Sequence, residues 1–476
     1  MAKHTGITSI LQTQMIKKCY LLLILPIVYG CSNKNEPIGM YPDYRNVTIP
    51  CNIAPLNFYY TGGKAETTFS YNDYSFSVKG RDVIVPEAKW KELLAKAKGD
   101  SIKISSSLMG NWSIYVSPDS IDQYLTYRLV EPAYEIANWV EIFERRISTF
   151  DERVLASYSN TYNACMNCHI HKGKNTFFYL RGRNGGAVLS RNGTLRKMTL
   201  KTESMFSGTV YGDLHPNGKW GVFSLNIVIP SFHTQSEKRL EVYDSKSDLC
   251  IVDFDNNQLL LHPSLTRADI LETFPCFSAD GSSIFYCAAD SVALPQDVKK
   301  LHYSLYRVPF DPETGEVGKQ TIVWDASQHK GSVCHPKPSP DGQWLLYTVA
   351  DYGTFPIWHR ECDLEMMNLA NGTFADMSEA NSDWSDTYHS WSSNSRWFVF
   401  ASKRDDGQYG KPFFCHVDEH GNVSKAFVLP QKDPHHYDKT LKSYNIPDLG
   451  KYPAYYDEDD IGRLHYYSEA ERFELK

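Results

Sequence analysis

The sequence predicts a mainly β protein that ends in a repeat architecture. At 476 residues the chain is longer than one hydrophobic core usually serves, so two or three domains are expected. Its 31 tyrosines, 29 glycines and 24 prolines are typical of many short strands joined by tight turns. The net charge of −7 and the lack of a basic stripe exclude the electrostatic surface of a nucleic-acid binder, so no nucleic-acid partner is expected.

Residues 1–31 have the pattern of an export signal. Two lysines precede the apolar run 19–30, which is too short to span a bilayer as a helix. The run ends in Val-Tyr-Gly-Cys31, which resembles the lipobox of bacterial lipoproteins, and polar residues follow it. We expect cleavage before Cys31, a lipid anchor on its thiol that attaches the protein to the membrane, and a linker over residues 32–46. An ordinary signal peptide with a chance cysteine is the alternative.

Residues 47–130 predict a small β-sandwich-like domain. Short runs of β-branched and aromatic residues alternate with Gly-Gly, Asn-Asp and Gly-Asn turn signals. One helix is expected from Pro86, a residue favoured at the first helical position, to about Gly99. The predicted strands are 57–60, 67–71, 75–78, 83–85, 102–105 and 112–116.

Residues 131–175 predict a helical linker. Apolar residues recur there in steps of three and four, which makes one face of an amphipathic helix over 131–147. These residues are Ala133, Ile136, Val140, Phe143 and Ile147. The helix would lead into the motif Cys165-Met166-Asn167-Cys168-His169.

From residue 176 to residue 476 the chain repeats itself, and the repeat predicts a β-propeller. Each copy contains the end of a strand, a tight turn and a second strand. The turns hold Asn-Gly, Asp-Gly, Asp-Gly and Asn-Ser, and the glycine pairs accept the positive φ angles of a hairpin turn. About 300 residues would hold roughly six four-stranded blades. The four copies lie at 214–224, 277–286, 338–347 and 391–400.

The C-x-x-C-H spacing of Cys165, Cys168 and His169 is that of c-type haem attachment. On a helical turn both thiols can reach the two vinyl groups of a porphyrin, and the next imidazole can reach the iron. We expect one covalent haem c, with thioethers from both cysteines and His169 as the proximal ligand. A zinc site, a thioredoxin-like redox pair and a plain disulfide are the alternatives. No pairing is assigned to the other cysteines.

The linker is too short to enclose a haem, so the second axial ligand is expected from the propeller. His215, His335 and His389 sit at or just before the repeated turn, on the segment that forms the inner strand of a blade. They could converge at the mouth of the channel. For each of them, the alternative is a turn or surface histidine.

The stretch DQYLTYRL at 122–129, the predicted helix, the Cys motif and the stretch 384–400 together resemble one family of Gram-negative bacteria. The Asp-Gly turns with their flanking strands also resemble the TolB-like, WD-like propeller repeat. The family consists of TolB-like propeller lipoproteins with a single C-x-x-C-H, sometimes labelled cytochrome c biogenesis proteins. The resemblance covers nearly all of the mature chain and implies a haem-bearing propeller. The family name describes a motif and a fold and implies no established activity.

Together these features predict a protein of the cell envelope, anchored in the outer membrane through Cys31 and facing the periplasm. Its haem would pass or sense electrons and its propeller would dock an unidentified protein or redox partner, for which catalysis is not required. Two other functions stay open: a haem-free TolB-like scaffold that binds a protein or an envelope polymer, and a haem peroxidase-like enzyme.

Overall fold

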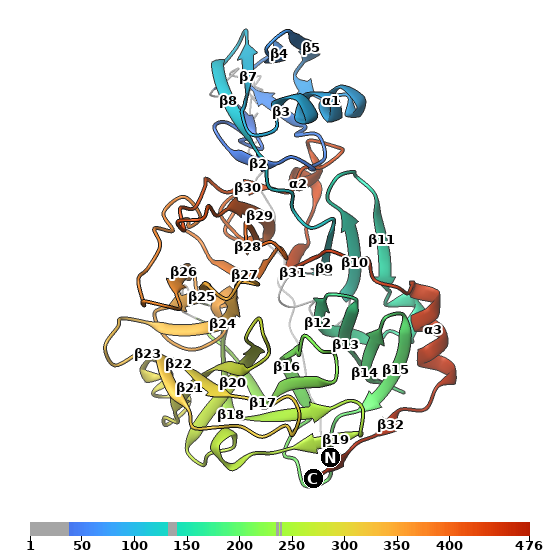
Figure 1. The fold of residues 1–476 in the computed structure, drawn as a ribbon, viewed down its shortest axis with the longest axis vertical. Coiled ribbons are helices and arrows are strands. Elements are labelled where there is room, and N and C mark those ends of the chain that lie inside the picture. Colours follow the sequence, from blue (N-terminus) through green and yellow to red (C-terminus); the bar gives the residue numbers. More distant parts are fainter. Residues whose placement is uncertain (1–37, 132–139, 235–237, 239) are drawn as a thin grey trace, which may run out of the picture. The chain divides into compact units, whose positions relative to one another are not determined.

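The computed structural model describes residues 38–131, 140–234, 238 and 240–476 (Figure 1). These residues form eight β-sheets and three α-helices. The prediction of a mainly β fold with a propeller is confirmed. None of the helices in the described residues is long and apolar enough to cross a membrane. The expected export signal and Cys31 lie outside the described residues.

The N-terminal domain packs one helix against a five-stranded sheet. α1 (Glu87–Ala97) begins after Pro86 and buries the side chains of Trp90, Leu93 and Leu94. The predicted helix is confirmed, and each of the six predicted strands has a counterpart. In sheet order the strands are β2 (Thr48–Pro50), β8 (Gly110–Ser117), β7 (Ser101–Ser106), β4 (Ala65–Tyr71) and β5 (Tyr74–Gly80), beside a three-stranded sheet of β1 (Gly39–Tyr41), β3 (Phe58–Thr61) and β6 (Asp82–Val83).

The start of this domain differs from the predicted boundary. β1 pairs with β3, and the side chain of Tyr44 is fully buried in the same core. Residues 38–46 are therefore folded, although the sequence predicted a linker over 32–46. The apolar side chains of Met40 and Tyr44 are the physical reason, because burying them stabilises the fold.

The other six sheets form the blades of the propeller. From the inner strand outward they are β31 (Ser443–Gly450), β9 (Tyr124–Val130), β10 (Val140–Arg146) and β11 (Glu152–Ala156); β12 (Cys165–Lys172), β13 (Asn175–Arg181), β14 (Gly186–Arg191) and β15 (Thr194–Thr199); β16 (Thr209–Leu214), β17 (Trp220–Phe232), β18 (Leu240–Asp253) and β19 (Gln258–Leu260); β20 (Ile270–Phe277), β21 (Ser283–Asp290), β22 (Ser304–Pro309) and β23 (Thr321–Trp324); β24 (Ser332–Pro338), β25 (Trp344–Ala350) and β26 (Asp363–Asn368); and β27 (Asp386–Trp391), β28 (Trp397–Ser402), β29 (Lys411–His416) and β30 (Phe427–Val428).

The inner strands of these sheets meet in a closed ring. Each of β12, β16, β20, β24, β27 and β31 contacts the next, and β31 contacts β12 again. The ring is closed by distant parts of the chain, because β31 near the C-terminus pairs antiparallel with β9. The first blade thus joins both ends of the propeller sequence.

The four repeated turns connect the inner strand of a blade to its second strand, and they share one hydrogen-bond pattern. In the second copy, the backbone N–H of Ser278 donates to Ser283 O at 2.8 Å, and that of Gly281 donates to Ser278 O at 2.9 Å. Equivalent bonds recur in the other three copies. In the fourth copy Ser395 takes the place of the glycine, with φ at 60°. That turn therefore belongs to the repeat although it lacks Asp-Gly.

The prediction of a helix over 131–147 is wrong for residues 140–146, which form a strand. Residues 132–139 lie outside the described residues, and Val140–Arg146 form β10, which pairs with β9 along its whole length. The apolar spacing also suits a strand, since Val140 and Ile142 are both buried. Pairing with the tyrosine-rich and leucine-rich β9 outweighs the local helical pattern. The propeller therefore begins with β9 at Tyr124. The sequence predicted that residues 124–130 belong to the N-terminal domain 47–130, that 131–175 form a helical linker and that the propeller begins at residue 176.

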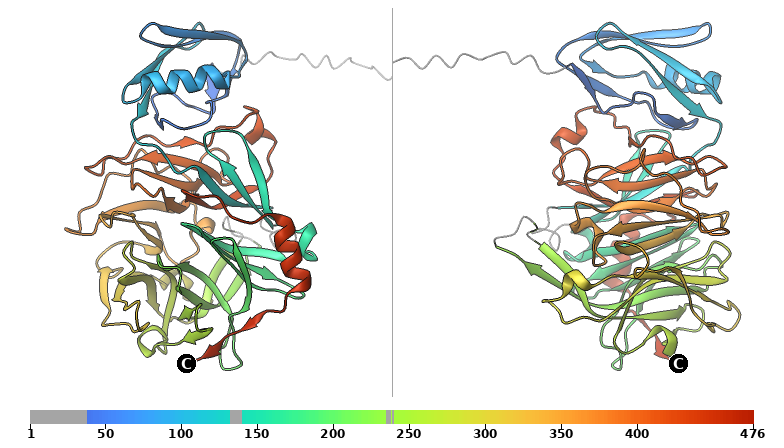
Figure 2. Two further views of the ribbon diagram at one scale, coloured as in Figure 1. Left: turned by 45° about the vertical axis from the view of Figure 1, so that its right-hand side comes forward. Right: turned by 90° about the vertical axis from the view of Figure 1, so that its left-hand side faces the viewer.

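The C-terminal tail runs along the outside of three blades (Figure 2). It contains α3 (Glu458–Tyr467), which starts with a capping box between Asp457 and Asp460. β32 (Glu471–Arg472) then pairs with β15, and β33 (Glu474–Leu475) pairs with β19. The shorter helices are η1 (Ser159–Thr161), η2 (Pro263–Leu265), η3 (Val298–Lys300), η4 (Pro356–Trp358) and α2 (His436–Lys439).

Candidate functional site: the central cavity of the ring

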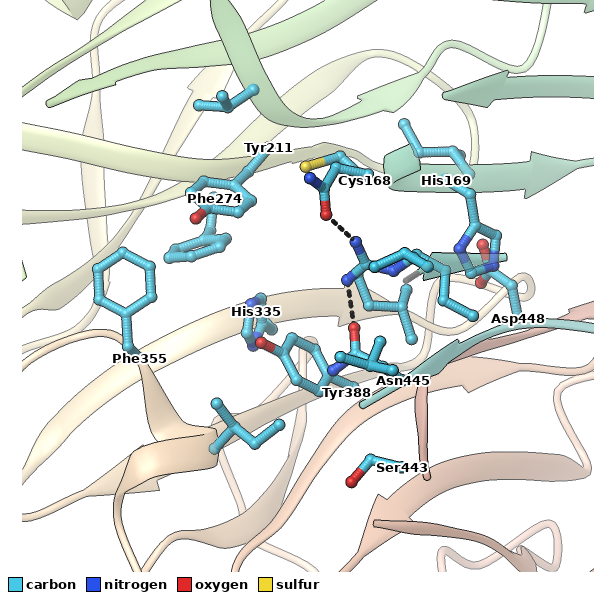
Figure 3. Close-up of a pocket in the computed structure, with 18 of the residues that line it drawn as sticks. Cys168, His169, Tyr211, Phe274, His335, Phe355, Tyr388, Ser443, Asn445 and Asp448 are labelled. Carbon is cyan, nitrogen blue, oxygen red and sulfur yellow. Dashed lines mark hydrogen bonds between the residues drawn. The ribbon is translucent and has the colours of Figure 1, made fainter. Parts of the chain in front are cut away.

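The inner strands surround a cavity of about 800 Å³ (Figure 3). All six blades contribute residues to its wall, and so does the segment after β25 that contains η4. Pockets that hold organic ligands usually measure about 300–1,000 Å³. The cavity therefore has the size of a ligand site.

Each inner strand is interrupted by a bulge at the cavity. Five of the bulges contain a non-glycine residue with φ between 48° and 56°, and the bulge of β16 contains Tyr211. A bulge redirects a side chain that regular pleating would point elsewhere. All of these side chains line the cavity. The five residues with positive φ are Cys168, Phe274, His335, Tyr388 and Ile446.

The bulges place backbone strain around the cavity. A side chain in the left-handed region costs on the order of 1–3 kcal/mol, and Ile446 is β-branched, which makes this conformation rarer still. Pro275, Pro336 and Pro447 follow three of the bulge residues, and proline is tolerated at a bulge because it needs no partner for an N–H. Strain of this kind concentrates at functional sites, which supports the cavity as the site.

Sequence reasoning missed most of the bulge residues, although a signal for them exists. Each repeated turn has one residue with positive φ, and these are Gly218, Gly281, Gly342 and Ser395. Seven residues before them stand Tyr211, Phe274, His335 and Tyr388, in that order. Aligning the four copies on their turns would have brought these residues into one column. Only His335 was singled out.

The C-x-x-C-H motif lies on β12 and not on a helical turn. Met166 points into a buried core, and residues 165–167 pair with β13 before the bulge at Cys168. Cys168 and His169 line the cavity (Figure 3). Cys165 is not among the lining residues, and its Sγ accepts a hydrogen bond from Asn167 Nδ2 at 3.0 Å. Both thiols of the motif are free.

His169 is a buried, neutral imidazole. Burial and, to a smaller extent, the positive charge of Arg128 together lower its pKa to about 3. The backbone of Thr126 acts in the opposite direction, but neither ring nitrogen has a hydrogen bond of normal geometry within the described residues. Buried polar atoms are almost always paired, so His169 is available to a ligand of the cavity.

The three histidines expected near the channel mouth fall into two groups. His335 and His389 line the cavity, whereas His215 lies in its turn, where its Nε2 is 3.1 Å from Gly281 O and its Nδ1 accepts from Asn217 N at 3.1 Å. His389 Nε2 is 2.9 Å from Leu346 O. The ring of His335 stands between those of Phe274 and Tyr388, with centroids 4.3 and 4.9 Å away, and its Nδ1 is unpaired in the described residues.

Two lysines lie in the wall. Lys403 Nζ donates to Ile357 O at 2.9 Å, and burial lowers its pKa to about 8. Burial also favours the neutral form of Lys337, but the charges of Asp213 and Asp448 outweigh it and raise the pKa above its ordinary value. Lys337 therefore stays charged beside its carboxylates. Lys403 lines the cavity, and although the charge of Asp406 acts on it, it forms no ion pair with a carboxylate in the described residues.

The long hairpin of β17 and β18 is tied to the segment that follows β25. Lys238 Nζ donates to Glu241 Oε1 at 2.9 Å and Tyr352 OH at 3.1 Å, and it lies 3.0 Å from His359 Nε2. Tyr352 OH donates in turn to Glu241 Oε2 at 2.7 Å. Val228 of the hairpin lines the cavity below this network. These bonds hold the β17–β18 hairpin and the segment after β25 together as one part of the cavity wall.

These positions test the expected haem. Cys168 and His169 both line the cavity, and the ring nitrogens of His169 are unpaired within the described residues, which suits a bound porphyrin. Attachment through two thioethers requires both thiols in the same space, and the strand does not bring Cys165 to the wall. The described arrangement therefore does not fit double attachment. Within the same residues, no group of three or more His, Cys, Asp and Glu side chains could hold a metal ion.

No family model and no curated protein matches this chain. Solved structures resemble it: TolB from Acinetobacter baumannii is 12% identical, with a TM-score of 0.44, and the match covers 77% of this chain and 86% of that one. A hypothetical selenium-binding protein from Sulfolobus tokodaii is 10% identical, with a TM-score of 0.43 and coverage of 76% and 92%. The likeness is one of fold. At these identities no function can be transferred from the neighbours to this chain.

Proposed function

We propose that this protein is a binding scaffold of the cell envelope that holds an organic ligand in the central cavity of its TolB-like propeller. The observation that carries the proposal is the ring of six bulges, which turns a side chain from every inner strand into one cavity of about 800 Å³. Closure of the ring does not by itself require strained backbone at the same level of each blade, so the bulges are better explained by a function of the cavity.

We propose binding as the role of the cavity. Among the described residues of the wall, neither Cys168 nor Ser443 is hydrogen-bonded to a histidine, which is the arrangement that activates a nucleophile. The Ser443 hydroxyl instead accepts from Gly410 N at 3.1 Å. The location in the envelope rests on the export signal and the lipobox, and we propose Cys31 as the lipid-bearing residue.

The proposal is tested with N-phenyl-1-naphthylamine, an uncharged fluorescent probe. We expect the folded protein to bind one molecule and Val228→Trp to lose at least tenfold in affinity, because the new indole fills the cavity. Val154→Trp is the matched control, since Val154 is also a half-buried strand valine but does not line the cavity. Circular dichroism confirms that the variants are folded. Equal binding to all three proteins would place the probe elsewhere and reject the cavity as the site.

Covalent haem is the second candidate, and Cys168 and His169 at the cavity wall are the observation that favours it. The protein is produced in the periplasm with haem-attachment machinery, denatured, and examined by haem stain and intact mass. If the ligand is haem c attached through the one thiol at the wall, wild type carries one haem mass, Cys168→Ser loses covalent attachment and Cys165→Ser keeps it. A denatured wild-type chain of unmodified mass would reject this candidate and leave the scaffold without haem.

A further inference from the structure

The cavity contains an arginine whose charge is not neutralised. Arg128 of β9 is only 8% exposed, and its Nη1 donates to Asn167 Oδ1 at 2.6 Å, while Nη2 donates to Asn445 Oδ1. The second of these bonds is drawn at Asn445 in Figure 3. Its Nε is buried and has no hydrogen-bond partner in the described residues. Both partners are neutral amides, so the guanidinium keeps its full charge.

A second arginine lines the same cavity. Arg181, at the end of β13, is exposed and forms no ion pair with a carboxylate in the described part of the chain. The positive charges of Arg128 and Arg181 both act on the Cys168 thiol, opposing the burial that raises its pKa. Both guanidinium groups therefore lie close enough to Cys168, in the bulge of β12, for their charges to act on its thiol.

The carboxylates of the wall are engaged elsewhere. Glu131 forms an ion pair with Lys442 at 3.2 Å. Asp448 accepts a hydrogen bond from His171 N at 3.0 Å and faces the charge of Lys337. Arg128, Arg181 and Lys403 are left without a carboxylate partner among the described residues of the wall, so the cavity is positively charged.

The rest of the wall is largely apolar. The ring of Tyr211 packs on Phe274 with centroids 4.4 Å apart, and Phe355 completes this aromatic cluster, with its ring centroid 5.9 Å from that of Phe274. A buried cation without a counter-ion is costly, and an anionic ligand would remove that cost on binding. A wall with aromatic rings and guanidinium groups that lack a carboxylate partner in the described residues suits a ligand with an apolar body and an acidic group.

We infer that the cavity binds an amphipathic organic anion, whose aromatic or aliphatic body packs against Tyr211, Phe274 and Phe355 and whose acidic group is bound by Arg128 and Arg181. The inference rests on the proposed function, because it names the class of ligand for the same cavity. Guanidinium groups bind carboxylates and related oxyanions through paired N–H donors, which gives the acidic group a defined position.

The test compares two probes that differ by one acidic group. 8-Anilinonaphthalene-1-sulfonate carries a sulfonate, and N-phenyl-1-naphthylamine has the same rings without it. We expect the folded protein to bind the sulfonate at least tenfold more tightly than the uncharged probe. Arg181→Gln should weaken binding of the sulfonate about tenfold and change binding of the uncharged probe less than twofold, since only the charged contact is lost.

The matched control is Arg183→Gln, which removes the same charge from an exposed arginine two residues away that does not line the cavity. It should leave both affinities unchanged. Arg128→Gln should resemble Arg181→Gln, and if this variant does not fold, Arg181→Gln still decides the question. Equal affinities of wild type for the two probes, both lost in Val228→Trp, would overturn the anion preference and keep the cavity. Probe binding that Val228→Trp does not alter would overturn the proposed function as well.

Discussion

A chain that ends after Thr440 is expected not to fold. The deletion removes β31, which pairs with β9 and contacts both neighbouring inner strands, so the ring stays open. It also removes the buried side chains of Tyr444 and Leu449 and leaves the buried Arg128 without Asn445. Domains are stable by only about 5–15 kcal/mol, and the loss of an inner strand is of that order. We expect no cooperative thermal transition and no near-ultraviolet circular dichroism.

The control is a chain that ends after Tyr452. It keeps β31 and loses α3, β32 and β33, which lie on the outer strands. This chain should fold with a lowered Tm, because the ring is closed but the bonds between Glu144 and the tail are absent. Adding a peptide of residues 441–456 should restore probe binding to the shorter chain. A cooperative transition at the wild-type Tm in the chain ending after Thr440 would show that β31 does not close the fold.

Replacing Asp244 by asparagine is expected to stabilise the protein above pH 7. Asp244 of β18 is fully buried, and neither carboxylate oxygen has a hydrogen bond of normal geometry in the described residues. Asn226 lies beside it, but its Nδ2 donates to Thr273 Oγ1 at 3.1 Å. Burial raises the pKa of Asp244 to about 7. The protonated form is therefore the one that the fold accommodates.

The sign of the pH dependence follows from this raised pKa. Between about pH 4 and pH 7 the folded chain holds a proton on Asp244 that the unfolded chain has released, so stability falls as the pH rises through that interval. At 1.36 kcal/mol for each pH unit, the loss above pH 7 is about 4 kcal/mol. Asp244→Asn carries no such proton and should be more stable than wild type by a similar amount at pH 8.5 and nearly equal to it at pH 4.

Urea unfolding at pH 4, 5.5, 7 and 8.5 measures this difference. The buried Glu272, whose pKa burial also raises to about 7, gives a slope of the same sign in both proteins, so the difference between them isolates Asp244. The exposed Asp290, replaced by asparagine, serves as the control and should follow wild type at every pH. Parallel curves for wild type and Asp244→Asn would show that the buried carboxyl does not titrate in this range.

The repeated turns were predictable because their chemistry is local. Asn217-Gly218 and Asp280-Gly281 fit a turn that requires positive φ, and the alternating apolar residues after them could only continue as strands. Helix α1 was predictable for the same reason, because Pro86 and the strong helix formers that follow it both favour a helix that begins there. In such segments the sequence within ten residues determines the structure.

The errors occurred where distant pairing decides. Residues 140–146 satisfy a helical spacing and a strand equally well, and only β9 beside them selects the strand. The Cys motif was expected on a helical turn, but β13 holds Cys165–Lys172 as a strand and the bulge turns Cys168 into the cavity. No local pattern shows that Asn445 meets Arg128 across the closure of the ring. The residues of the cavity wall could therefore not be predicted without knowing the fold.

The closure by β31 also sets an order of events. A chain is synthesised from its N-terminus, so the strands of blades two to six exist before the strand that completes the first blade. Until residues 443–450 join β9, Arg128 lacks its hydrogen bond to Asn445 and the wall of the cavity is incomplete. Ligand loading therefore follows synthesis of the whole chain. In the envelope location that we propose, the ligand would have to be supplied outside the cytoplasmic membrane.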